Sequence, residues 1–233
     1  MTERGMIFNA EMVRAILDGR KTQTRRIMKP QPEPCPRGGH WWPSNVFKTM
    51  LHVEDEMQNG KGGWGGLVGD ACPFGDVGDR IWVRETFQGP LFDYDLMDSY
   101  CKDPTPFEKP EFCVYKADGV PAPEFYDADD ELHCCWRPSI HMPRWASRIL
   151  LEITDVRVER LNAISEEDAR AEGIIDGGCL NCGEPEPCGC ANPEPDATDA
   201  FAYLWQSIYG QESWNANPWV WVIEFERVEG GAA

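Results

Sequence analysis

"MIFNAEMVRAILDGRKTQTRR", residues 6 to 26, combines an apolar start, an amphipathic segment and a dense basic cluster. The apolar start predicts a short strand, and the helical spacing of Met12, Ala15 and Ile16 predicts a helix behind it. Asn9 is a suitable N-cap for this helix, and Gly19 is a suitable stop. The cationic residues then follow the helix directly, where positive charge also favours the C-terminal end of the helix dipole.

This basic cluster contrasts with the charge of the whole chain, which has 40 acidic and 22 basic residues and a formal charge of −18. Residues 1–37 carry a local charge of +4, whereas residues 91–132 carry −9. Phosphate contacts with long duplex DNA require an extended basic face, so the composition argues against that partner. The cluster is interpreted either as a solvated loop or as a compact site for a small or single-stranded ligand.

The remaining pattern predicts an α+β fold. Residues 78–87, 147–161 and 218–228 alternate apolar and polar side chains as half-buried strands do. Ser165 and Asp168 predict the start of a short helix that ends at Gly173, and Thr198 predicts the N-cap of a helix with Phe201 on its buried face. That face also includes Leu204, Trp205 and Ile208.

Pro-rich and Gly-rich connections interrupt these elements. We expect a single domain over residues 1–233, with insertions at about 30–78 and 89–132 and a Cys-rich loop at 177–197. Residues 30–78 are predicted to form a long loop with at most one short strand. Several strands with few short helices favour a small mixed β-barrel with flanking helices over a doubly wound parallel sheet.

Several segments carry a resemblance to a known family. "GRKTQTRR", residues 19–26, resembles the Gly-x-Lys-x-x-Thr-x-Arg signature of the ASCH domain family, a PUA-like β-barrel group associated with RNA and nucleosides. "GDRIWVRETF", "WRPSIHMPRWASRILLEITDVRVERL" and "WVWVIEF" are similar to segments of its longer phage and prophage members. The resemblance implies a PUA-like small mixed β-barrel.

The ASCH amidohydrolases that deacetylate N4-acetylcytidine use a lysine, a threonine and a glutamate, which by motif fall on Lys21, Thr24 and Glu172. The match to Glu172 comes through "LNAISEEDARAEG", residues 161–173. In the implied chemistry Lys21, discharged by burial and neighbouring arginines, acts as a base. Thr24 acts as nucleophile or positions a water, and Glu172 transfers the proton. In a regular strand Lys21 and Thr24 point to opposite sides, so their cooperation requires a turn of the backbone.

Further residues are candidates for ligand binding. A cation beside an aromatic ring can stack on a base and contact phosphate, and a carboxylate can accept from a base edge. The alternatives are an ordinary ion pair at a strand end for Arg84 and Glu85, and a core position for Trp145. The predicted ligand-binding residues are Arg25, Arg26, Arg84, Glu85, Arg144, Trp145 and Arg148.

The cysteines suggest a metal. Cys179, Cys182, Cys188 and Cys190 lie within twelve residues and could supply the four thiolates of a structural zinc site. Free thiols are the alternative, and no organic cofactor is predicted. The other cysteines show no pairing pattern and stay unassigned: Cys35, Cys72, Cys101, Cys113, Cys134 and Cys135.

Two main functions fit these features. One is a hydrolase acting on the C–N amide bond of a modified cytidine such as N4-acetylcytidine; the other is a PUA-like reader of single-stranded RNA or modified bases, or a ribonuclease. The lack of a second basic run favours a small ligand. A weaker alternative is a phage accessory protein that contacts a host protein through the acidic residues 91–132. With neither a leader pattern nor an apolar run of membrane-spanning length, we expect a cytoplasmic protein without a membrane partner.

Overall fold

The computed structural model describes residues 1–58, 67–126, 131–175 and 197–228. Helices and several sheets are both present, so the predicted α+β class is confirmed, and none of the sheets formed by these residues closes into a barrel. The chain divides into two compact units. Unit 1 comprises Met1–Leu17, Arg80–Glu152 and Arg227–Ala233, and unit 2 comprises Asp18–Asp79 and Ile153–Glu226.

The largest sheet has five strands in the order β1-β6-β11-β12-β2. Strand β6 runs parallel to β1 and antiparallel to β11, and β12 runs antiparallel to β2. The predicted strands at 78–87, 147–161 and 218–228 are confirmed as β6, β11 and β12. The bounds are β1 Glu3–Ile7, β2 Gln23–Ile27, β6 Arg80–Arg84, β11 Leu150–Arg160 and β12 Trp219–Arg227.

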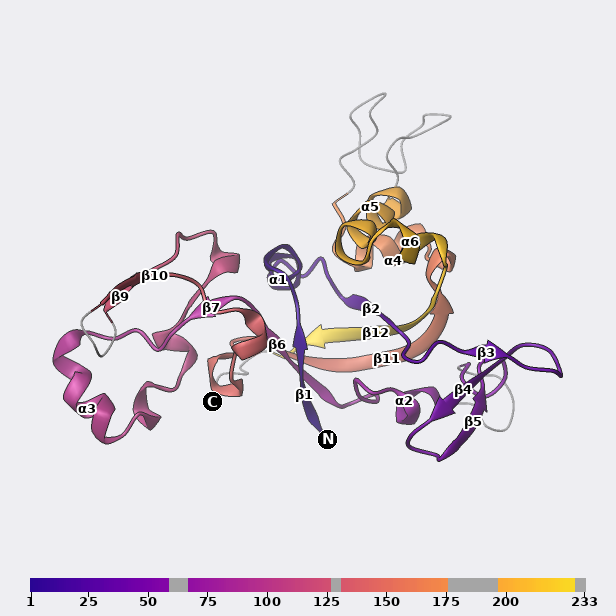
Figure 1. Cartoon of the computed structure of the whole chain (residues 1–233), viewed down its shortest axis with the longest axis horizontal. Helices are drawn as coiled ribbons and strands as arrows, with labels where there is room; N and C mark the ends of the chain where they lie inside the picture. Colours follow the sequence, from indigo (N-terminus) through magenta and orange to yellow (C-terminus); the bar gives the residue numbers. More distant parts are fainter. Residues whose placement is uncertain (59–66, 127–130, 176–196, 229–233) are drawn as a thin grey trace, which may run out of the picture. The chain divides into compact units, whose positions relative to one another are not determined.

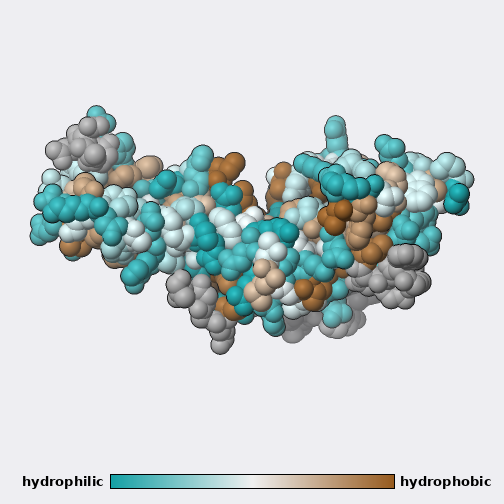
Figure 2. All heavy atoms as spheres, turned by 90° about the horizontal axis from the view of Figure 1, so that it is seen from below, coloured by the Kyte–Doolittle hydropathy of each residue, from teal (hydrophilic) through white to brown (hydrophobic). Residues whose placement is uncertain are grey.

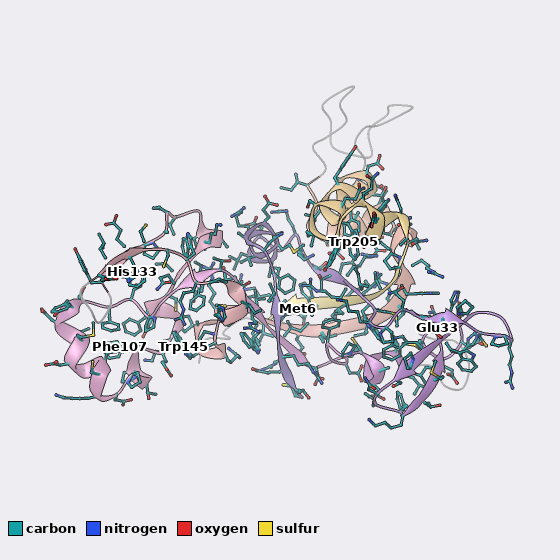
Figure 3. The ribbon with its side chains drawn as sticks, in the orientation of Figure 1. Met6, Glu33, Phe107, His133, Trp145 and Trp205 are labelled. Atoms are coloured by element: carbon teal, nitrogen blue, oxygen red, sulfur yellow. The ribbon has the colours of Figure 1, made fainter. Side chains whose placement is uncertain are left out.

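Unit 1 also contains the first helix, α1 (Ala10–Leu17). The Asn9 side chain accepts from the Met12 backbone N–H at 2.8 Å, so the predicted cap is confirmed. A core of Phe87, Tyr115, Met142 and Ala146 joins the segments around Trp145, which Figure 3 labels. The other elements of this unit are β7 Phe87–Gln88, α3 Met97–Lys102, β8 Val114–Tyr115, β9 Glu124–Tyr126 and β10 Leu132–Cys134, with 3-10 turns at Tyr94–Leu96, Thr105–Phe107, Pro110–Phe112, Lys116–Asp118, Ser139–His141 and Arg144–Ala146.

In unit 2, three helices cover one face of β12 and β2 (Figure 1). They are α4 (Glu166–Ala171), α5 (Ala197–Tyr209) and α6 (Gln211–Asn215), and a 3-10 turn at Leu161–Ala163 precedes them. Phe201 and Trp205 of α5 pack against Val220 and Val222 of β12. Figure 3 shows Trp205 within this helical group. Of the predicted apolar face of α5, Ile208 is instead 45% exposed.

The other face of β12 meets a small second sheet of three strands. Its strands are β3 (Glu33–Pro34), β4 (His40–Ser44) and β5 (Thr49–His52), followed by α2 (Leu67–Ala71). Trp42 of β4 contacts Trp221 of β12 edge to face, with ring centroids 5.4 Å apart. The prediction of a long loop over residues 30–78 was therefore wrong, because tryptophan packing supports short strands between the Pro and Gly turns.

Side chains cap the starts of two helices in unit 2, α4 and α5. Ser165 accepts from the Asp168 N–H at 3.1 Å, which confirms the predicted start of α4. Thr198, predicted to cap the next helix, instead lies inside α5, which begins at Ala197. The Glu166 carboxylate accepts from the backbone N–H groups of Ala197 and Thr198, both at 3.1 Å. A charge from α4 thus stabilises the first turn of α5.

The surface is mainly polar on the face shown in Figure 2, where hydrophobic residues form separate small groups. Among the described residues, none of the helices is long and apolar enough to cross a membrane.

The cap on α5 gives a testable prediction. We expect Glu166→Ala to lower the free energy of unfolding by about 0.5–2 kcal/mol, because two N–H groups lose their acceptor. Urea unfolding followed by circular dichroism measures this. Glu167→Ala is the matched control, since Glu167 has the same charge in the same turn of α4 and is exposed. Equal losses in the two variants would show that the cap contributes nothing beyond the charge on α4.

Candidate functional site

The backbone of unit 2 brings Lys21 and Glu172 together. Lys21 lies two residues before the start of β2, and Glu172 is the C-cap of α4. The two residues form an isolated antiparallel bridge, and the adjacent Thr22 N–H donates to the Ala171 carbonyl at 2.8 Å. Gly173 at φ 88° lets the chain turn away directly after this contact. Main-chain pairing therefore fixes the two side chains beside each other.

The Lys21 amine is enclosed with the Glu172 carboxylate. Its Nζ donates to Glu172 Oε2 at 2.6 Å and to the Glu172 carbonyl at 2.9 Å. The two side chains are 0% and 3% exposed. Burial lowers the pKa of Lys21 and outweighs the opposing attraction of Glu172, and the charges of Arg26 and Arg25 lower it further. Lowering the pKa of an amine increases its neutral fraction at a given pH, and the neutral form is the one that accepts a proton.

Arg25, predicted to bind ligand, lies among carboxylates instead. Its Nη1 is 3.2 Å from Glu172 Oε1, and its Nη2 is 3.3 Å from Glu159 Oε2 and 3.2 Å from Asp168 Oδ2. The side chain is 0% exposed, and its guanidinium carbon lies 5.8 Å from the Phe201 ring centroid. Arg25 is thus an internal counter-ion rather than an open contact for a ligand.

A second arginine, which the sequence did not single out, completes this ion-pair network. Arg157 of β11 donates to Glu159 Oε1 at 2.6 Å and to Asp168 Oδ1 at 2.8 Å, and also pairs with Glu224. Although burial raises the pKa of Asp168, the charges of Arg25 and Arg157 outweigh it and hold that pKa below its ordinary value. Each cation is thus shared between elements, which ties α4 to β2, β11 and β12.

Thr24 occupies the other face of β2. In the β2–β12 register Arg25 pairs with Val222, which faces the helices, and Thr24 pairs with Ile223. Because successive residues of a strand alternate, Thr24 points away from α4. Thr24 is buried, and the hydrogen bonds found among the described residues do not link it to Lys21 or Glu172. The structure therefore brings the Lys21 amine and the Glu172 carboxylate together, as predicted, but does not place the Thr24 hydroxyl beside them.

The other predicted residue of the basic cluster, Arg26, is half-buried beside the pair. In the register of β2 it lies opposite Trp221. Its charge acts on Lys21 by lowering the pKa of the amine.

Glu85 and Arg148 form a separate cluster in unit 1. Arg148 donates in a two-pronged manner to Glu85 at 3.0 and 3.1 Å and also to Asp118 at 3.0 and 2.7 Å. Its guanidinium carbon lies 3.9 Å from the Tyr115 ring centroid. Burial raises the pKa of Glu85 in spite of the opposing effect of Arg148. Glu85 therefore forms its ion pair with Arg148.

The other predicted residues of unit 1 are also engaged within the protein. Arg84 donates to the Ile140 carbonyl, and its guanidinium lies over the Trp82 ring. Arg144 donates to Glu3 at 2.9 Å. Trp145 is partly buried against the Phe87 core, as expected for a core tryptophan. Asp118, the partner of Arg148, and Glu3, the partner of Arg144, were not identified from the sequence.

An open hollow of about 240 Å³ is also present in unit 2. It is lined by Glu54, Gln58, Val158, Glu159, Arg160, Ala163 and Trp219. Lys21, Thr24 and Glu172 are not among these residues, so the hollow does not open onto the buried pair.

The predicted zinc ligands Cys179, Cys182, Cys188 and Cys190 lie outside the described residues, so zinc stays a prediction. Among the residues that the structure does describe, no cluster of three or more His, Cys, Asp or Glu side chains could hold a metal ion. In the same part of the chain Cys35, Cys72, Cys101, Cys113, Cys134 and Cys135 are free thiols. Burial raises the pKa of the Cys113 thiol to about 11, which makes it a poor nucleophile.

Comparisons with protein-family models, with curated proteins and with solved structures found no match to this chain.

Removing the amine tests the geometry of the pair. We expect Lys21→Met to lower the free energy of unfolding by about 3–5 kcal/mol, because Glu172 and its carbonyl lose a buried donor. Urea unfolding at neutral pH measures this, with Lys29→Met as the control because Lys29 is exposed in the same unit. A Lys21→Met protein as stable as the Lys29→Met protein would mean that the pair is not enclosed as described.

Proposed function

We propose that this chain is an ASCH-type, PUA-like hydrolase that cleaves the amide bond of an N4-acylated cytidine or a related modified nucleoside. One observation carries the proposal: the Lys21 amine lies 2.6 Å from the Glu172 carboxylate, and both side chains are closed to water. These are two of the three residues that the family resemblance points to, and they are 151 positions apart in the chain. Enclosure lowers the pKa of the amine, as a general base requires.

Water supplies the nucleophile in this proposal. Lys21 takes a proton from water as the oxygen attacks the acyl carbon, and Glu172 stabilises the ammonium that forms. The ammonium then gives this proton to the carboxylate, which passes it to the departing N4 nitrogen as the C–N bond breaks. The products are the carboxylic acid and the free cytidine amine, and Lys21 returns to its neutral form. Thr24 has a structural role and no catalytic one in this proposal, because its side chain faces away from α4.

Access to this pair requires a movement. Because the two side chains are 0% and 3% exposed, a substrate reaches the amine only when the contact between β2 and the end of α4 opens. Closing over the substrate would then exclude bulk water from the reacting groups.

The competing proposal of a single-stranded RNA reader or ribonuclease has less support. Phosphate binding requires cations that are free to meet it. In the described part of unit 1, Arg144 and Arg148 already contact carboxylates, and Arg84 already donates to a carbonyl. A small neutral nucleoside needs no such cations. Contact of the acidic residues 91–132 with a host protein stays a separate, untested prediction.

The purified protein should convert N4-acetylcytidine to cytidine and acetate, as followed by chromatography. Lys21→Met and Glu172→Gln should each lower kcat/KM by about 10²–10⁴-fold, because each removes a proton-transfer group. The rate should rise with pH as Lys21 loses its proton, and the midpoint should lie below the ordinary lysine value of 10.5 because its pKa is lowered.

The control for this assay is Lys29→Met, which removes an exposed lysine and should retain full activity. Short single-stranded RNA is tested in parallel for cleavage and retention. Tight retention of RNA with no turnover of acylated nucleosides would overturn the hydrolase proposal in favour of the reader.

A further inference from the structure

Arg25 contacts the oxygen of Glu172 that Lys21 leaves free. Lys21 Nζ donates to Oε2 at 2.6 Å, and Arg25 Nη1 donates to Oε1 at 3.2 Å. We propose that Arg25 is a positioning residue: it fixes the Glu172 carboxylate against Lys21 and competes with the amine for its negative charge, so that Lys21 releases its proton more easily. The catalytic meaning of this role rests on the proposed function, but the effect on the amine does not.

The position of the guanidinium is set by several elements. Glu159 of β11 and Asp168 of α4 hold Nη2 at 3.3 and 3.2 Å, and Phe201 of α5 lies against the group. A planar guanidinium with its donors in a fixed fork cannot rotate without breaking these contacts. Arg25 therefore presents Nη1 to Glu172 from one fixed direction.

The charges around the pair define what Arg25 does. Lys21 faces Glu172 at the end of α4, and the positive charges of Arg25 and Arg26 on β2 lower its pKa. Among the described residues, Glu172 has ion pairs with Lys21 and Arg25. Without Arg25, the carboxylate would have Lys21 as its one remaining cation, and a positive charge beside the amine would be lost. Both effects strengthen the hold of Lys21 on its proton.

Arg157 provides a matched comparison within the same network. It shares Glu159 and Asp168 with Arg25, so these two carboxylates keep a cation when Arg25 is removed. Among the described residues, Arg157 forms ion pairs with Asp155, Glu159, Asp168 and Glu224, and not with Glu172. Neutralising Arg157 thus also removes one cation from the network, but it leaves the partners of the Lys21–Glu172 pair unchanged.

The test is a pH titration of Lys21 by NMR in the wild-type protein, in Arg25→Gln and in Arg157→Gln. Glutamine keeps hydrogen-bond donors and removes the charge. The titration midpoint of Lys21 should rise in Arg25→Gln and stay close to the wild-type value in Arg157→Gln. The pH profile of kcat on N4-acetylcytidine should shift in the same direction. Each pH unit by which the Lys21 midpoint rises lowers the fraction of neutral amine about tenfold at pH values below the midpoint.

An unchanged or lower midpoint in Arg25→Gln, or an equal rise in both variants, would overturn the proposal. Circular dichroism checks that each variant is folded, and Arg25→Met provides a second uncharged variant should Arg25→Gln not fold. The NMR titration needs no turnover. A wild-type protein without hydrolase activity would therefore contradict the proposed function, while the titration midpoints of Lys21 would still decide the role of Arg25.

Discussion

A lysine and a glutamate, 151 positions apart in the chain, share one enclosed space in this protein. Burying either charge without a partner costs several kcal/mol, so Lys21 depends on Glu172, and Glu172 depends on Lys21 and Arg25. Their contact therefore requires β2 and the end of α4 to be in register, and the backbone bond between Thr22 and Ala171 maintains that register. The position of the end of α4 beside the start of β2 depends on the same contact.

The surrounding charges extend this constraint across unit 2. Arg25 and Arg157 distribute their donors over carboxylates on β11, β12 and α4, and Phe201 of α5 covers one of the two guanidiniums. Such a network is worth little where it is exposed and more where it is buried: the Arg25 side chain is 0% exposed, whereas those of Arg157 and Asp168 are 21% exposed and that of Glu224 is 41% exposed. The same enclosure that holds the elements together lowers the pKa of the Lys21 amine, so stability and reactivity have one physical origin here.

The sequence predicted the features that depend on local pattern. The caps at Asn9 and Ser165 and the alternation in β6 and β11 require only neighbouring residues, and these predictions are confirmed. The three strands between residues 30 and 58 were missed, because frequent Pro and Gly residues hide short strands whose stability comes from distant contacts such as Trp42 with Trp221.

The site was predictable only in part. A family resemblance, rather than any local pattern, pointed to Glu172 as the partner of Lys21. The sequence could not show that Arg25 faces carboxylates, since Glu159 and Asp168 come from elements more than 130 residues away. The β11 alternation does place Arg157 and Glu159 on one face, opposite the buried Val156 and Val158. This pattern could have indicated an internal ion pair.

The most direct measurement is a double-mutant cycle on the free energy of unfolding with Lys21→Met, Glu172→Gln and the double variant. If the two groups are in contact, each single substitution already removes their interaction, and the double variant cannot remove it again. The losses of unfolding free energy should therefore be non-additive, with a coupling energy of about 0.5–3 kcal/mol. Losses that add to within about 0.3–0.5 kcal/mol would contradict it, since they would mean that the amine and the carboxylate do not meet in the folded protein.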